Sequence, residues 1–171
     1  MTLLYLLSTP RVYNRLLAEL TAAAAEGRLA RPVAREAETR QLPYLQAVVR
    51  EGLRVFPSLT PLLAKAVPAG GDVVVNGHWL PAGTELGIDG WGVLRSPAYW
   101  GPDAAVFRPE RWLGLEPARA DEMAETLEIL FGYGKNKCLG RGIALMEINK
   151  VLVEVSVYPF HPLPAALPCW S

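Results

Sequence analysis

Cysteine and histidine are scarce in this chain of 171 residues, which contains only two of each. Two cysteines, Cys138 and Cys169, cannot build the disulfide framework of a small secreted protein. The histidines, His78 and His161, are far apart, and the sequence contains no cluster with the spacing of zinc ligands. A reducing compartment is therefore the default expectation.

Net charge and long apolar runs are also missing. The 17 basic residues balance 17 acidic ones, so the chain lacks the charge excess of a polyanion binder, and we expect no nucleic-acid partner. No stretch approaches the roughly 18 consecutive apolar residues of a membrane span, and residues 1–7 lack the basic start of a signal peptide. With 51% hydrophobic residues, the composition predicts a soluble globular protein with one core.

The hydrophobic pattern predicts a mainly α protein with a small β region. Apolar residues recur at helical spacing in residues 10–27 and 43–57, which each open with a proline, and again in residues 140–155. Residues 3–7 are typical of the last turns of another helix. Asn76-Gly77, between two short apolar runs, predicts a β-hairpin, because both residues tolerate the positive φ of a type I′ turn.

The remaining segments are less regular. We expect a strand at residues 84–88, an ordered but irregular meander with three tryptophans at residues 91–115, and a short acidic helix or turn at residues 121–130. The hydroxyl of Thr9 is expected to cap the helix that follows it. The Glu116–Arg119 motif contains a proline, and we expect it to lie outside a helix.

Cys138 is the candidate ligand or nucleophile. It lies in a glycine-rich loop directly before a helix, Phe131-Gly-Tyr-Gly-Lys-Asn-Lys-Cys-Leu-Gly140. Lys135, Lys137 and the helix N-terminus favour a thiolate there, and a thiolate is a soft anionic ligand. The alternative is an ordinary buried cysteine in a turn. The glycines do not bind phosphate, because Lys137 replaces the third glycine of a dinucleotide loop and Arg141 stands where a Walker loop has lysine.

Two charged motifs are weak signals when each is taken alone. Glu51 and Arg54 are three residues apart on the expected helix and can form an ion pair, but a solvated surface pair explains the same spacing. In Pro109-Glu-Arg-Trp112, an arginine beside a tryptophan commonly stacks on the ring. Each motif needs a wider context.

The order of these motifs supplies that context. The helical Glu-x-x-Arg at Glu51, the Pro-Glu-Arg-aromatic segment at Pro109 and the Phe-x-x-Gly-x-x-x-Cys-x-Gly loop ending at Gly140 resemble the C-terminal portion of the cytochrome P450 family of haem-thiolate monooxygenases. The similarity covers about residues 3–154. Val-Pro-Ala-Gly-Gly71 and Lys-Asn-Lys-Cys-Leu-Gly are similar to filamentous-fungal members.

The resemblance implies haem b as the cofactor, with Cys138 as the axial ligand of its iron. Phe131 would pack beside the sulfur, and Gly134, Asn136 and Gly140 would complete the haem side of the loop. A thiolate pushes electron density onto iron and favours O–O cleavage, so that one oxygen atom is inserted into a small apolar organic substrate. NADPH–cytochrome P450 reductase would supply the electrons to the parent enzyme.

The resemblance also implies a structural network and contacts to the haem propionates. Glu51, Arg54 and Arg111 would form a buried charge network that links the helix to the meander and holds the Cys loop in place. Asn136 and Lys65 stand where the family usually has arginine or histidine for the two propionates. Lys135 or Lys137 would compensate for Asn136, and Arg95 is another candidate partner.

Part of the family pattern is absent from this sequence. The oxygen-activating helix would precede Met1, together with most of the substrate pocket and the anchor that places a full-length parent at the endoplasmic reticulum membrane. Residues 59–63 are the retained segment expected to approach the substrate. We expect residues 1–154 to be the family portion and interpret the Pro-rich residues 155–171 as an unrelated tail from a read-through intron.

The functional alternatives follow from this incompleteness. One is a catalytically inactive truncated or pseudogene product without stable haem binding. Another is a structural or interaction module that kept the motifs.

Overall fold

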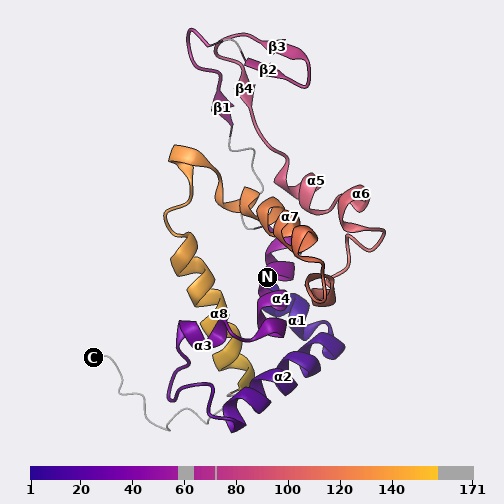
Figure 1. The fold of residues 1–171 in the computed structure, drawn as a ribbon, viewed down its shortest axis with the longest axis vertical. Coiled ribbons are helices and arrows are strands. Elements are labelled where there is room, and N and C mark those ends of the chain that lie inside the picture. Colours follow the sequence, from indigo (N-terminus) through magenta and orange to yellow (C-terminus); the bar gives the residue numbers. More distant parts are fainter. Residues whose placement is uncertain (58–63, 72, 158–171) are drawn as a thin grey trace, which may run out of the picture.

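The computed structural model describes residues 1–57, 64–71 and 73–157. Within these ranges, five helices form the body of the protein (Figure 1), namely α1 (Thr2–Leu7), α2 (Pro10–Ala25), α3 (Glu36–Thr39), α4 (Pro43–Val55) and α8 (Arg141–Val157). Helix α4 contacts α1, α2 and α8, and both α2 and α3 pack against α8. The first and last parts of the described chain therefore share one core.

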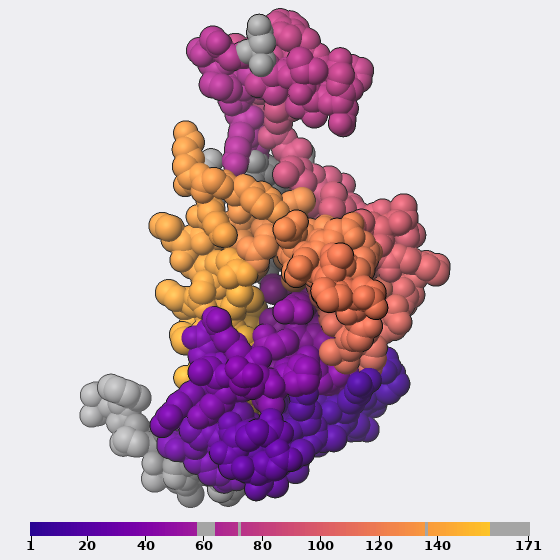
Figure 2. Space-filling model, viewed as in Figure 1, coloured from indigo at the N-terminus to yellow at the C-terminus, as the bar shows by residue number. Residues whose placement is uncertain are grey.

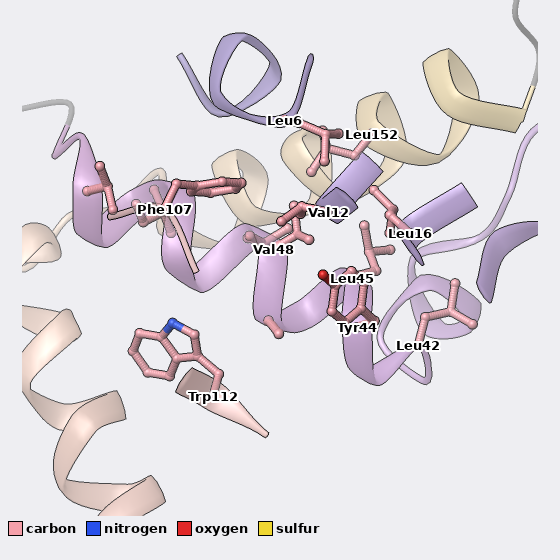
Figure 3. Close-up of a cluster of buried hydrophobic side chains, with 14 of the residues drawn as sticks. Leu6, Val12, Leu16, Leu42, Tyr44, Leu45, Val48, Phe107, Trp112 and Leu152 are labelled. Atoms are coloured by element: carbon pink, nitrogen blue, oxygen red, sulfur yellow. The ribbon is translucent and has the colours of Figure 1, made fainter. Parts of the chain in front are cut away.

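Apolar residues at helical spacing build this core (Figure 3). Helices α2, α4, α1 and α8 all contribute branched aliphatic side chains to this buried cluster, among them the labelled Val12, Leu16, Leu45, Val48, Leu6 and Leu152. Burying a side chain of this size stabilises the folded state by about 1.5–3 kcal/mol. The expected helices are confirmed here, and α2 and α4 each have a continuous apolar stripe.

The first turn of α2 differs from the expectation in one detail. Thr9 occupies the N-cap position, but its side chain makes no capping hydrogen bond. Its backbone carbonyl already accepts the N–H groups of Val12 and Tyr13, at 2.9 and 3.1 Å. Since the donor that the hydroxyl would cap is occupied, the predicted cap is wrong.

Helices α1 and α4 cross very closely at Gly52. A Cβ atom added there would lie 2.3 Å from Oγ1 of Thr2, well inside van der Waals contact. Glycine at this position therefore allows the two helices to approach each other.

Among the residues that the structure describes, four short strands make up the β region. Strands β2 (Val73–Val75) and β3 (His78–Leu80) pair antiparallel, with Val74 opposite Trp79. The turn between them has positive φ at Asn76 (49°) and Gly77 (80°), as the Asn-Gly signal predicts. Figure 2 shows this hairpin standing clear of the helical body.

The second sheet joins β1 (Lys65–Ala66) to β4 (Glu85–Leu86). Lys65 pairs with Leu86 and Ala66 with Glu85. The expected strand at residues 84–88 is therefore shorter, and its partner β1 was not expected. The mainly α fold with a small β region is confirmed.

Short helices replace the irregular meander. They are α5 (Gly90–Leu94), α6 (Pro97–Trp100) and the 3-10 turn η1 (Pro109–Trp112). Helix α7 (Pro117–Glu128) begins four residues before the expected acidic helix, so Glu116 is its N-cap and Arg119 lies within it. The expectation that this motif lies outside a helix is wrong. Proline lacks a backbone N–H, but the N–H groups of the first helical turn have no partner within the helix, so proline is tolerated there.

The last helix, α8, covers most of the expected range and runs to Val157. Of the proposed Pro-rich tail, residues 158–171 lie outside the described part of the chain, as do residues 59–63. In the part of the chain that the structure describes, no helix is both long and apolar enough to cross a membrane.

Candidate functional site

A single carboxylate, that of Glu51, organises the buried centre of α4. Its two oxygens accept five hydrogen bonds at 2.8–2.9 Å, from Nε and Nη2 of Arg54, Nε of Arg111, Nε1 of Trp112 and the backbone N–H of Arg108. The side chains of Glu51 and Arg54 are 0% exposed, and that of Arg111 is 4% exposed. A buried charge is tolerated when it is fully paired, and Glu51 meets that condition.

The two arginines carry this network into the meander. Nη1 of Arg54 donates to the carbonyls of Leu94 and Ala104, both at 2.7 Å. Nη1 of Arg111 donates to the carbonyl of Trp100, and its Nη2 donates to that of Asp103, both at 3.0 Å. Backbone carbonyls from several turns of the meander thus converge on two guanidinium groups.

The structure therefore brings Glu51, Arg54 and Arg111 together in one place. Removing one member of a buried network of this kind typically costs about 3–5 kcal/mol, because another charge loses its partner. The sequence did not reveal Trp112 as a fourth member. The feature that could have identified it is the indole N–H, because a buried tryptophan needs an acceptor for this group.

Glu110, the neighbour of Arg111, points to a different cluster. Its carboxylate accepts hydrogen bonds from Nη1 of Arg11 at 2.6 Å and from the hydroxyl of Tyr44 at 2.8 Å, and Nη1 of Arg15 lies 3.3 Å away. Burial alone would raise the pKa of Glu110, but the hydrogen bonds and charge of Arg11 and the hydroxyl of Tyr44 outweigh it and lower the pKa to about 2. Burial is the largest cause that raises the pKa of Tyr44, followed by the bond to Glu110. The η1 turn thus bonds on one side to α2 and on the other to the middle of α4.

The Cys loop connects α7 to α8 through two 3-10 turns, η2 (Ile129–Phe131) and η3 (Gly134–Asn136). Gly132 and Gly134 have positive φ, 67° and 62°, which a residue with a side chain rarely adopts. The N–H of Cys138 donates to the carbonyl of Phe131 at 2.7 Å and closes the loop. Cys138 itself is exposed, so it is not the buried cysteine of the alternative interpretation.

Two exposed apolar residues follow Cys138 closely in the sequence. Leu139 is 102% exposed and Ile143 is 60% exposed. The burial of α8 is confined to its second half, at Asn149, Leu152, Val153 and Ser156, although the helix is apolar on most sides. A helix that is apolar all round is normally covered, so the surface beside Cys138 is suited to a large apolar group.

A cavity of about 720 Å³ lies between the β region and the Cys loop. Its lining is mainly apolar and includes Val67, Leu86, Ile88, Leu130 and Tyr133. Lys65 is the cationic residue in its wall. Because η2 and Gly132 form one wall, the cavity adjoins the loop that carries the thiol. Figure 1 shows this loop at the end of α8 nearest the β region.

The other candidate propionate partners lie in different settings. Nε and Nη2 of Arg95 donate to the carbonyl of Val55, at 3.0 and 2.5 Å, and its guanidinium carbon lies 4.0 Å from the ring centroid of Trp91. These contacts fix Arg95 against the end of α4. Lys137 faces the carboxylate of Glu128 across 4.0 Å. The side chain of Asn136 lies outside the described part of the structure.

The rest of the described chain offers no competing metal centre. Among the residues that the structure describes, no group of three or more His, Cys, Asp or Glu could hold a metal ion. Any metal bound by this part of the chain through Cys138 would need most of its ligands from elsewhere. A porphyrin supplies such ligands, so the donor set fits haem.

Comparisons with known proteins agree with these observations. A family model described as cytochrome P450 matches residues 1–155. The cytochrome P450 monooxygenase aba1 of Botryotinia fuckeliana is 41% identical over 169 residues, which cover 98% of this chain and 33% of that protein. The monooxygenase ABA1 of Pyricularia oryzae is 44% identical over 154 residues (90% and 30%), and a pisatin demethylase of Fusarium vanettenii is 36% identical over 157 residues (90% and 28%). The chain spans about one third of the length of these fungal relatives.

Proposed function

The chain belongs to the cytochrome P450 family, whose members bind haem, and we propose that it supplies the thiolate-ligand side of a haem-dependent monooxygenase. The single observation that carries the proposal is the exposed Cys138, on a loop closed by its own N–H and bordered by a mainly apolar cavity. When bound, the haem supplies the activation of O2 and the insertion of one oxygen atom into a C–H bond.

In this proposal, Cys138 would hold the haem iron through its sulfur. The 2.7 Å hydrogen bond from its N–H to the carbonyl of Phe131 fixes the backbone that carries the sulfur. Lys137 and the start of α8 would place positive charge near an iron-bound anionic sulfur. The exposed apolar side chains of Leu139 and Ile143 would contact the haem and exclude water from it.

Lys65 would bind one haem propionate in this arrangement. It is exposed on β1 and lines the cavity beside Gly132 and Tyr133. An ammonium group binds a carboxylate as a point charge, without the paired contacts that arginine makes. Gly134, Asn136 and Gly140 would form the haem side of the loop, and Arg95, which is bonded to the carbonyl of Val55, would be another propionate partner.

Glu51, Arg54 and Arg111 have a structural role. Their network fixes the meander on α4, and the meander leads through α7 into the Cys loop. The network therefore keeps the loop in place without touching the reacting atoms.

The substrate and redox partner follow from the family and complete the proposal. A small apolar organic molecule is the substrate, and NADPH–cytochrome P450 reductase supplies the electrons. Two of the fungal relatives are named monooxygenases and one is named a demethylase, which supports oxidation of an organic substrate by the whole protein.

The test is the spectrum of the chain with haem. The chain is expressed with haem, purified and reduced, and the CO difference spectrum is recorded. A thiolate-ligated haem gives the red-shifted Soret band, and Cys138→Ala should abolish that band while Cys169→Ser retains it. A chain that folds but never shows the band would contradict the proposal and support the inactive alternative.

A further inference from the structure

Helix α7 ends at Glu128, directly beside the Cys loop. Oε1 of Glu128 accepts a hydrogen bond from Nε of Arg141 at 3.1 Å and a second from Nη2 of the same residue. Oε2 of Glu128 lies 4.0 Å from Nζ of Lys137. Lys137 immediately precedes Cys138, and Arg141 is the first residue of α8. One carboxylate therefore contacts cationic residues on both sides of the cysteine.

The contact to Arg141 extends to the backbone of the cysteine. The guanidinium carbon of Arg141 lies 5.4 Å from the ring centroid of Phe131. The carbonyl of Phe131 in turn accepts the N–H of Cys138 at 2.7 Å. Glu128, Arg141, Phe131 and Cys138 are thus connected by successive contacts, in which the carboxylate holds the guanidinium over the ring.

Charge makes Glu128 distinctive among the residues near this loop. The sequence from 129 to 146 contains Lys135, Lys137 and Arg141 but no aspartate or glutamate. The side chain of Glu128 is only 28% exposed, so its charge is screened less than that of a fully exposed residue. Its single negative charge faces two of the three cations near the cysteine, Arg141 and Lys137, and offsets part of their positive charge.

We propose that Glu128 is a positioning residue for the Cys loop and that its charge moderates the positive potential at the iron-bound sulfur. This inference rests on the proposed function of Cys138. Unbalanced positive charge near the sulfur favours the reduced iron, which carries one more electron. Loss of the Glu128 charge should therefore raise the midpoint potential, and loss of its contacts should loosen the loop.

The first experiment compares Glu128→Gln with Glu122→Gln in the full chain loaded with haem. Glu122 is a matched control, because it also lies on α7 and pairs with an arginine, Arg119, at 2.6 Å. Redox titration should show about a threefold higher ratio of reduced to oxidised haem for Glu128→Gln at a fixed potential, which is a rise of about 28 mV for one electron. Glu122→Gln should titrate like the parent chain.

A third variant separates charge from other effects. Glu128→Gln combined with Arg141→Gln removes the cation that lost its partner, so the midpoint should return toward that of the parent chain. Equal midpoints for Glu128→Gln and Glu122→Gln would overturn the electrostatic part of the inference. A Glu128→Gln chain that loses haem while Glu122→Gln retains it would support the positioning part.

The second experiment needs no haem. Hydrogen exchange of the haem-free chain is followed in peptides covering residues 131–141. We expect the Cys138 amide to exchange at least about threefold faster in Glu128→Gln than in Glu122→Gln, because its acceptor Phe131 is no longer held by Arg141. Equal exchange would refute the positioning role. Should the parent chain never bind haem, the proposed function fails, and this measurement still decides whether Glu128 holds the loop.

Discussion

Replacing Trp112 by phenylalanine tests the buried charge network with little change in packing. The substitution keeps a six-membered ring in a site that is 6% exposed and removes the indole N–H that donates to Oε2 of Glu51 at 2.9 Å. A hydrogen bond to a charged group contributes about 1.5–3 kcal/mol. Oε2 would retain only one donor, Nε of Arg54, so we expect the free energy of unfolding to fall by about 2–4 kcal/mol once the lost ring contacts are included.

Trp100→Phe is the matched control for this experiment. Trp100 is 5% exposed, and its Nε1 donates to the neutral backbone carbonyl of Val93 at 3.0 Å. The same loss of ring atoms there removes a bond worth about 0.5–1.5 kcal/mol. Equilibrium urea unfolding, followed by far-UV circular dichroism, should therefore show that Trp112→Phe lowers the free energy of unfolding by at least about 1 kcal/mol more than Trp100→Phe does. An equal or smaller cost would refute the claim that Trp112 belongs to the charge network.

Three further outcomes are expected. Gly52→Ala should lower the free energy of unfolding by about 1–3 kcal/mol through overpacking. Gly142→Ala, which has open space around its Cβ position, should leave that free energy unchanged or raise it. Equal thermal melts for the two variants would contradict the close helix crossing. The carboxylate of Glu110, with its pKa lowered from 4.5 to about 2, contributes stability that is present above pH 4.5 and lost as the pH falls toward 2. Urea unfolding at several pH values should therefore show a shallower pH dependence in Glu110→Gln, and an unchanged profile would count against the lowered pKa. Lys65→Gln should weaken haem binding in a spectroscopic titration without lowering the melting temperature of the haem-free chain, and unchanged affinity would exclude the propionate contact.

The sequence was sufficient for elements whose signal is local. Helices α2 and α4 have proline at the first turn and a continuous apolar stripe, and the Asn76-Gly77 turn needs only its own two residues. Strand β1 was not predicted, because its two residues form a strand only by pairing with Glu85 and Leu86, about twenty positions later in the sequence. The short helices of the meander were missed for a similar reason, since tertiary contacts rather than periodicity fix them.

The candidate site divides in the same way. The spacing of Glu51 and Arg54 indicated an ion pair but not whether it is buried, whereas the resemblance to a family added Arg111 and implied burial. Trp112 and Glu128 were missed because their partners lie 61 and 13 residues away, at Glu51 and Arg141. No local pattern predicts which donor fills the last position on a buried carboxylate.

The long sequence separation within the Glu51 network has a consequence for synthesis on the ribosome. The donors from the η1 region lie 57, 60 and 61 residues beyond Glu51, at Arg108, Arg111 and Trp112. A nascent chain that has completed α4 still lacks these donors, so its carboxylate must stay hydrated until the η1 turn leaves the exit tunnel. Helix α4 can therefore pack into the core only late in translation, when the meander has been synthesised and the two fold together as one cooperative unit.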